Sequence, residues 1–207
     1  MPARTTRDSA KKKPQSAAGG REQIKTFRTA GQFAAWLQKN HGKSSGVWAR
    51  IAKKGSKLKS MTYAEALDTA LCYGWIDALK RAEGESAWLQ RFVPRRPKSL
   101  WSKINRGRAL ALIDRGEMKD PGLAEVERAK QDGRWDAAYD SPAAAGVPPE
   151  LEAALNRNTR ARKFFDKLDR INRYAVIWRV QTATAGETRA RRVATLVAML
   201  EKGEKLH

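Results

Sequence analysis

Cysteine and histidine are scarce in this sequence. Its 207 residues include one cysteine, Cys72, and two histidines, His41 and His207. A single cysteine excludes an internal disulfide framework, and one thiol with two imidazoles falls short of the four ligands of a structural zinc site. We therefore expect no metal, and no motif predicts a cofactor.

Long apolar runs are also missing. The longest, such as residues 193–200, are interrupted by threonine and alanine and are much shorter than the ~20 residues of a membrane-spanning helix. The first residues are basic, but no apolar stretch follows them, so no secretory signal is predicted. We expect a cytoplasmic protein without an integral membrane segment.

Acidic residues are few relative to basic ones, 22 against 42, and the formal net charge is +20. Residues 26–60 and 91–108 contain no acid, and residues 157–207 carry a net charge of +8, whereas residues 61–90 and 109–156 are net negative. This pattern predicts either a surface that binds an anionic partner or ion pairs between blocks of opposite sign.

The sequence divides into three parts, and 41% hydrophobic residues suffice for a real core. Residues 1–25 lack apolar periodicity, which predicts a disordered basic tail. Residues 26–140 mix strand and helix patterns, which predicts an α+β domain with a small antiparallel sheet. Residues 148–207 show only the helical period, which predicts an all-helical module. Its helices are expected near residues 149–156, 159–168, 171–182 and 187–201.

Capping and turn signals locate the elements of the α+β part. Thr29 is a candidate N-cap of a first helix, and Thr62 with Glu65 forms a capping box for a second helix that Gly74 ends. Alternation predicts a strand over residues 47–52 and a hairpin of residues 75–81 and 87–93. After Ser99, the predicted buried stripe of a third helix consists of Leu100, Trp101, Ile104, Ala111 and Leu112.

Residues 70–77 (ALCYGWID) contain a thiol and a carboxylate. A nucleophilic cysteine needs a base within reach, and no histidine lies near Cys72 in sequence, which favours a buried core thiol. Asp77 lacks a second carboxylate at a useful spacing, so an ion pair or a cap is favoured over acid–base catalysis.

Residues 91–108 are the most informative stretch, with seven cations and no acid. Arginine forks, together with hydroxyls at a helix N-terminus, suit phosphate or carboxylate oxygens. The alternative of pairing with the two acidic blocks is equally favoured. The candidate anion-binding residues are Arg91, Arg95, Arg96, Lys98, Ser99, Ser102, Lys103 and Arg106.

Two further groups stand out. Within residues 132–140, Asp132-Gly133 predicts a helix end, and Trp135 with Tyr139 is typical of an i, i+4 packing pair. Arginines in the helical part could contact nucleic acid. The candidates for that contact are Arg160, Arg162, Arg189 and Arg192.

Several stretches together resemble the YdeI/OmpD-associated family of bacteriocin-protection proteins: LCYGWID, RFVPRRPKSLWSKIN, GRWDAAYD and ETRARRV. The resemblance implies an OmpD-associated (OmdA-type) helical module in the C-terminal part, an N-terminal part similar to YjbR/CyaY-like domains, and a role in resistance to bacteriocins or antimicrobial peptides. It implies no catalytic residues. The motif residues that we expect to be structural are Cys72, Gly74, Trp75, Asp77, Trp101, Trp135 and Tyr139.

Three functional hypotheses result. The first is a non-enzymatic protein that binds an anionic partner through its basic surface. The second is a nucleic-acid-binding protein that uses the C-terminal arginines. The third is an enzyme acting on an anionic small molecule in a cleft lined by Trp75, Asp77 and residues 94–98 (PRRPK).

Overall fold

The computed structural model describes residues 23–207, apart from the side chain of Glu187. This part of the chain is α+β, as predicted, with one four-stranded sheet and eight helices. The strands are β1 (Ile24–Lys25), β2 (Val47–Ala52), β3 (Trp75–Glu83) and β4 (Ala87–Pro94). The helices are α1 (Ala30–Asn40), α2 (Tyr63–Cys72), α3 (Lys103–Asp114), α4 (Asp120–Gln131), α5 (Pro149–Asn156), α6 (Thr159–Asp166), α7 (Arg170–Gln181) and α8 (Gly186–Glu201).

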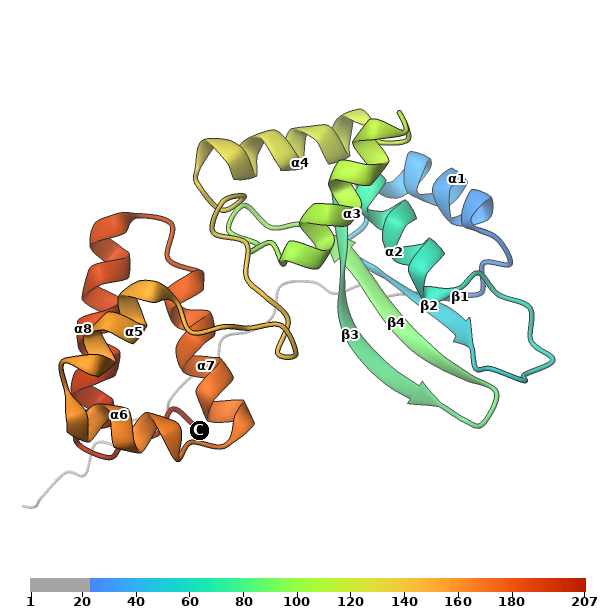
Figure 1. The fold of residues 1–207 in the computed structure, drawn as a ribbon. Helices are drawn as coiled ribbons and strands as arrows, with labels where there is room; N and C mark the ends of the chain where they lie inside the picture. The colour runs from blue at the N-terminus through green and yellow to red at the C-terminus, as the bar shows by residue number, and fades with distance from the viewer. Residues whose placement is uncertain (1–22) are drawn as a thin grey trace, which may run out of the picture.

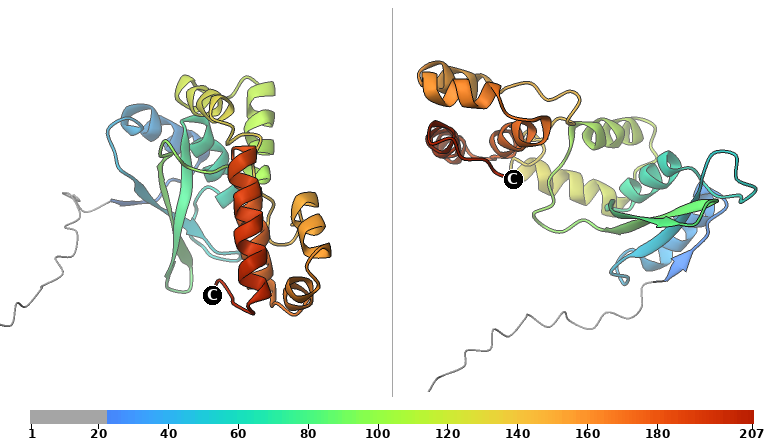
Figure 2. Two further views of the ribbon diagram at one scale, coloured as in Figure 1. Left: turned by 90° about the vertical axis from the view of Figure 1, so that its left-hand side faces the viewer. Right: turned by 90° about the horizontal axis from the view of Figure 1, so that it is seen from below.

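The elements form two neighbouring groups. Helices α1–α4 lie with the sheet, and helices α5–α8 gather beside it (Figure 1), an arrangement that the two further views also show (Figure 2). Residues 1–22 of the expected tail lie outside the described residues. Its last residues belong to the sheet as β1, because the Trp48 amide donates to the carbonyl of Gln23 and anchors this segment.

The sheet is mixed, with the order β1-β2-β4-β3. The pairs β2/β4 and β4/β3 are antiparallel, as expected, but β1 is parallel to β2, so the expectation of an antiparallel sheet fails at this edge. The predicted hairpin is present, and its turn contains Gly84 at φ +61°, a conformation that glycine adopts without steric cost. Between Asp77 and Lys80 the register shifts, which marks a bulge in the edge strand.

The capping predictions are confirmed. Thr29 accepts a hydrogen bond from the Gln32 amide at the start of α1. Thr62 and Glu65 form the reciprocal capping box of α2. Gly74 follows α2 at φ +71°, where an added Cβ would lie 2.8 Å from the Pro121 carbonyl oxygen. The glycine is therefore required both for the turn and for the close approach of α4.

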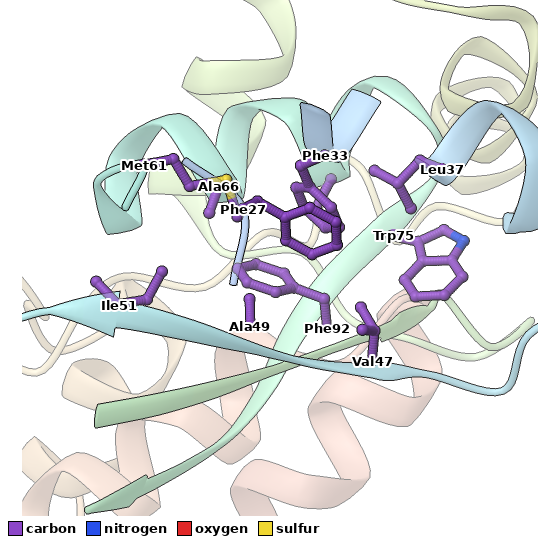
Figure 3. Packing of buried hydrophobic residues seen from close by; sticks show 11 residues of the cluster. Phe27, Phe33, Leu37, Val47, Ala49, Ile51, Met61, Ala66, Trp75 and Phe92 are labelled. Carbon is purple, nitrogen blue, oxygen red and sulfur yellow. The ribbon is translucent and has the colours of Figure 1, made fainter. Parts of the chain in front are cut away.

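The first core lies between the sheet and the helices that cover it. Alternate residues of β2 point toward α1 and α2, as the pleat of a strand requires (Figure 3). Phe33 and Phe92 meet at the centre, with ring centroids 5.4 Å apart. Trp75 closes one end of this core and is 1% exposed, with its Nε1 donating to the His41 carbonyl at 3.2 Å.

The third helix differs from its predicted form. It begins at Lys103 with Ser102 as its N-cap, so Leu100 and Trp101 precede it, and Ile104 is 55% exposed. The predicted stripe failed because Trp101 and Lys103 exchange backbone hydrogen bonds with Tyr139, which keeps this segment extended. The residues of α3 that are buried are Ala109 and Leu112.

Trp135 and Tyr139 do not form a helical pair. Helix α4 ends at Gln131, and Gly133 at φ +77° completes the predicted helix end. Trp135 packs against Trp101 with centroids 4.9 Å apart, whereas Tyr139 packs against Trp178 of α7 at 6.0 Å. Tyr139 therefore connects the two groups of elements.

Helices α5–α8 lie close to their predicted positions and enclose a separate cluster of buried side chains. The predicted stripe of α8 contributes Val193, Leu196 and Leu200, with Val197 partly buried beside them. Leu151, Leu155 and Phe165 complete the centre of this cluster and are fully buried.

Candidate functional site

The predicted anion-binding stretch contains a buried arginine. Arg95 is 6% exposed, and its guanidinium carbon lies 3.6 Å from the centroid of the Trp101 ring. Its Nη1 donates to the Leu100 carbonyl at 3.2 Å, while Nε and Nη2 have no hydrogen-bond partner within residues 23–207. Burial lowers the Arg95 pKa to about 10. Arg95 therefore packs beneath this segment and does not face outward.

Other cations of the stretch meet acidic or carbonyl groups of the same chain. Lys103 pairs with Asp140 at 2.9 Å, and Arg108 pairs with Asp68 of α2 at 2.7 Å. Arg106 donates to the Trp135 carbonyl at 3.1 Å. Lys103 and Arg108 therefore form ion pairs with the two acidic blocks, residues 109–156 and 61–90.

The two serines of the stretch make local hydrogen bonds. Ser102 accepts from the Asn105 amide as the N-cap of α3, and Ser99 accepts from the Arg96 amide at 2.9 Å. Arg96 and Lys98 are exposed at the turn between β4 and α3. Arg91 is half-buried on β4. The eight predicted residues therefore do not converge on one hollow.

The motif of residues 70–77 is packed against the helices. Cys72 is 7% exposed, and burial raises the pKa of its thiol to about 11. Asp77 accepts a hydrogen bond from the Tyr63 hydroxyl at 2.7 Å. Burial and this hydrogen bond raise the pKa of Tyr63. In these contacts the thiol is kept protonated and the carboxylate holds β3 against α2.

A cleft between α7 and α8 gathers cations around an apolar wall. Its volume is about 560 Å³, within the ~300–1,000 Å³ typical of small-molecule sites. Leu100 reaches it from the β4–α3 connection, and Leu206 reaches it from the segment after α8. The residues that line it are Leu100, Trp178, Arg179, Thr182, Arg191, Arg192, Thr195, Leu196, Met199 and Leu206. We call this hollow the α7/α8 cleft.

The α7/α8 cleft gathers three arginines, and the described side chains that line it supply no counter-charge. Among the described residues that line it, none has a carboxylate. Arg192 donates from Nη1 to the Arg179 carbonyl at 2.8 Å and to the Thr182 hydroxyl at 3.3 Å. Arg179 donates to the Ala175 carbonyl one turn earlier. Over residues 23–207, none of Arg179, Arg191 and Arg192 forms an ion pair with a described side chain. An anion that enters the cleft therefore meets arginines that no described carboxylate neutralises.

The four arginines proposed for nucleic acid are dispersed. Arg162 pairs with Glu152 at 2.5 Å and with Asp166 at 2.9 Å, and Arg189 pairs with Glu150 at 3.5 Å. Arg160 lines a smaller hollow of about 280 Å³ together with Lys163 and Lys167. Arg192 alone among the four lies in the α7/α8 cleft.

Sequence reasoning missed most of the cleft, including Trp178, Arg179 and Arg191. A signal does exist on α8, where Arg191, Thr195 and Met199 recur at four-residue intervals beside the buried stripe. Residues at such a border lie between the apolar and polar faces of a helix, so they place cations next to apolar side chains. The contributions of Leu100 and Leu206 have no comparable signal, because they come from distant segments.

Two classes of feature are not found among the described residues. Within residues 23–207, no group of three or more His, Cys, Asp or Glu side chains is placed to hold a metal ion. Over the same residues, no helix combines the length and apolarity that crossing a membrane demands.

Comparison with known families separates the two parts of the chain. Residues 25–125 match a family described as a domain of unknown function, DUF8412. Residues 144–203 match the family described as "Bacteriocin-protection, YdeI or OmpD-Associated", which confirms the resemblance inferred from the sequence. No curated protein and no solved structure matches the chain. The α7/α8 cleft is built mainly from residues inside the second match.

Proposed function

We propose that this chain, which carries a YdeI/OmpD-associated domain, acts in bacteriocin protection by binding an anionic molecule in the α7/α8 cleft. The observation that carries the proposal is the set of three arginines, Arg179, Arg191 and Arg192, around a hollow whose described lining includes no carboxylate. Charged groups that face an apolar wall attract an anion more strongly than the same groups in water, because the local dielectric constant is lower.

The charge argues against direct capture of cationic peptides. The net charge of +20 repels a cationic antimicrobial peptide. Protection would instead depend on an anionic molecule of the cell that the protein holds, and we place this action in the cytoplasm. No catalytic group is part of the proposal.

We further propose that α5–α8 form a helical OmpD-associated module over residues 148–207, and that residues 26–140 form an α+β domain of the YjbR/CyaY-like kind. The family match over residues 144–203 supports the first of these assignments. The second rests on the α+β order of β1–β4 and α1–α4.

A survival assay tests the proposed function. Bacteria that lack the gene are complemented with the wild type, with the double variant Arg179→Gln/Arg191→Gln, or with Arg160→Gln, and are then challenged with a bacteriocin. We expect the wild type and Arg160→Gln to restore survival and the double variant to fail at equal protein levels. Equal survival with and without the wild-type protein would refute the proposal.

Nucleic acid is the competing anion, and a gel-shift assay addresses it. The full chain and a chain lacking residues 1–22 are titrated with DNA and with RNA. Nucleic-acid binding could persist in the truncated chain and in the Arg179→Gln/Arg191→Gln variant but be lost in Arg160→Gln/Lys163→Gln. That result would assign nucleic-acid binding to the hollow on α6.

A further inference from the structure

We infer that the ligand of the α7/α8 cleft is an amphipathic anion, namely a carboxylate on an unbranched apolar chain. The inference rests on the proposed function for the position of the site, and it adds the chemical class of the ligand. It follows from the apolar wall, from the placement of the arginines and from the volume of the cleft.

The wall of the cleft is apolar over most of its area. Leu196 is 5% exposed and belongs to the core of the helical part, and Met199 and Leu206 are partly buried beside it. Trp178 adds an aromatic side, which is fixed by its contact with Tyr139. Leucine offers no hydrogen bonds and the methionine thioether is only a weak acceptor, so this wall favours a methylene chain over a sugar or a nucleotide.

Arg191 and Arg192 line the cleft and would hold the carboxylate headgroup of such a ligand. The Arg192 guanidinium is oriented by its bonds to the Arg179 carbonyl and the Thr182 hydroxyl, and it retains further N–H groups. Arg191 is exposed, one residue earlier on α8. A planar guanidinium matches a carboxylate through two parallel hydrogen bonds, which a lysine cannot form.

The hollow lined by Arg160, Lys163 and Lys167 provides an internal comparison. It also gathers three cations, but its volume is about 280 Å³ and Glu201 is among its lining residues. That hollow offers charge without an equivalent apolar wall, so it could hold a small anion and not a chain. Affinities for carboxylates of increasing chain length therefore distinguish the two hollows.

A free carboxylate fits better than a lipid within a bilayer. Leu100 and Leu206 reach the cleft from outside the two helices. The His207 amide also bonds to the side chain of Asn172, which ties the segment containing Leu206 to α7. A chain in the cleft is therefore contacted by side chains from several segments, whereas a bilayer offers its headgroups at a flat surface.

Isothermal titration calorimetry with the full chain tests the ligand class. Acetate, hexanoate, octanoate and decanoate are titrated in turn, with octanol and octylammonium as controls for charge. We expect affinity to rise about fourfold for each added methylene, until the chain fills the cleft. Octanol and octylammonium should bind at least tenfold more weakly than octanoate. Equal affinity for acetate and decanoate would overturn the inference.

Three variants locate the binding. Arg191→Gln should weaken octanoate binding about tenfold, because a hydrogen bond to a charged group is lost, while the matched change Arg160→Gln should leave it unaltered. Thr195→Trp fills the cleft from an exposed position and should abolish the dependence on chain length. Circular dichroism confirms that each variant is folded. Unchanged octanoate affinity in both cleft variants would overturn the inference.

Flotation with phosphatidylglycerol vesicles distinguishes the two sources of this chemistry. Failure to float, together with octanoate binding, supports the free carboxylate. Flotation that requires Arg191, combined with carboxylate affinities in solution that do not depend on chain length, would overturn the inference in favour of a lipid headgroup. If no carboxylate binds but Arg179 and Arg191 remain necessary for survival, the ligand class is wrong and the proposed function stands.

Discussion

Gly122 provides a sharp test of how α2 and α4 pack. A Cβ added to Gly122 would lie 2.5 Å from the Cys72 carbonyl oxygen and 2.7 Å from that of Leu71, whereas ordinary contact begins near 3.4 Å. Both carbonyls are backbone atoms at the end of α2, so they cannot rotate away. The Gly122→Ala change must therefore separate the two helices.

The expected cost can be worked out from this geometry. Overpacking of this kind costs about 1–3 kcal/mol. Separation also strains the hydrogen bond from the Lys119 amide to the Cys72 carbonyl, 3.1 Å long, which is worth about 1 kcal/mol. Alanine returns about 1 kcal/mol through its helix propensity. The free energy of unfolding should fall by about 1–3 kcal/mol.

Gly107 is the matched control. It lies inside α3, and a Cβ there meets no atom within 4 Å. The Gly107→Ala change should therefore raise stability by about 1 kcal/mol, through helix propensity alone. Urea unfolding followed by tryptophan fluorescence gives both values. Wild-type stability of Gly122→Ala, or a shift of both variants in the same direction, would refute this close packing of α2 and α4.

Three further predictions concern Cys72 and Tyr63, both on α2. At pH 8, Cys72 should react with a disulfide reagent much more slowly in the folded protein than in the unfolded protein, because burial raises the pKa of its thiol from 9.0 to about 11. Equal rates in the two states would contradict this burial. The stability associated with the neutral thiol is fully present below pH 9 and should decline as pH rises toward 11, which a Cys72→Ala comparison isolates. Tyr63→Phe removes the hydroxyl that donates a hydrogen bond to Asp77, and it should lower the free energy of unfolding in urea by about 1.5–3 kcal/mol. A decrease below about 0.5 kcal/mol would show that this hydrogen bond contributes little.

Local signals predicted much of the fold. The capping box of Thr62 and Glu65 and the turn at Gly84 depend on residues a few positions apart, and both are present. The stripe that included Ile104 failed because a bridge to Tyr139, far along the chain, delays the start of α3. The strand at Ile24–Lys25 was also missed, since two residues are too few for a visible alternation.

The candidate site was harder to predict, because it depends on contacts between distant segments. The pair of Arg108 and Asp68 spans 40 residues, and no pattern in residues 91–108 distinguishes a paired arginine from an exposed one. Arg95 lies in the same acid-free run, but stacking on Trp101 removes it from solvent. The α7/α8 cleft joins Leu100, two helices and Leu206, which sequence periodicity cannot bring together.

The affinity of the full chain for octanoate tests the central claim most directly. Calorimetry should show that octanoate binds more tightly than acetate, that Arg191→Gln weakens this binding about tenfold, and that Arg160→Gln does not change it. Equal losses in the two variants would mean that net charge, and not the α7/α8 cleft, attracts the anion, and would contradict the account.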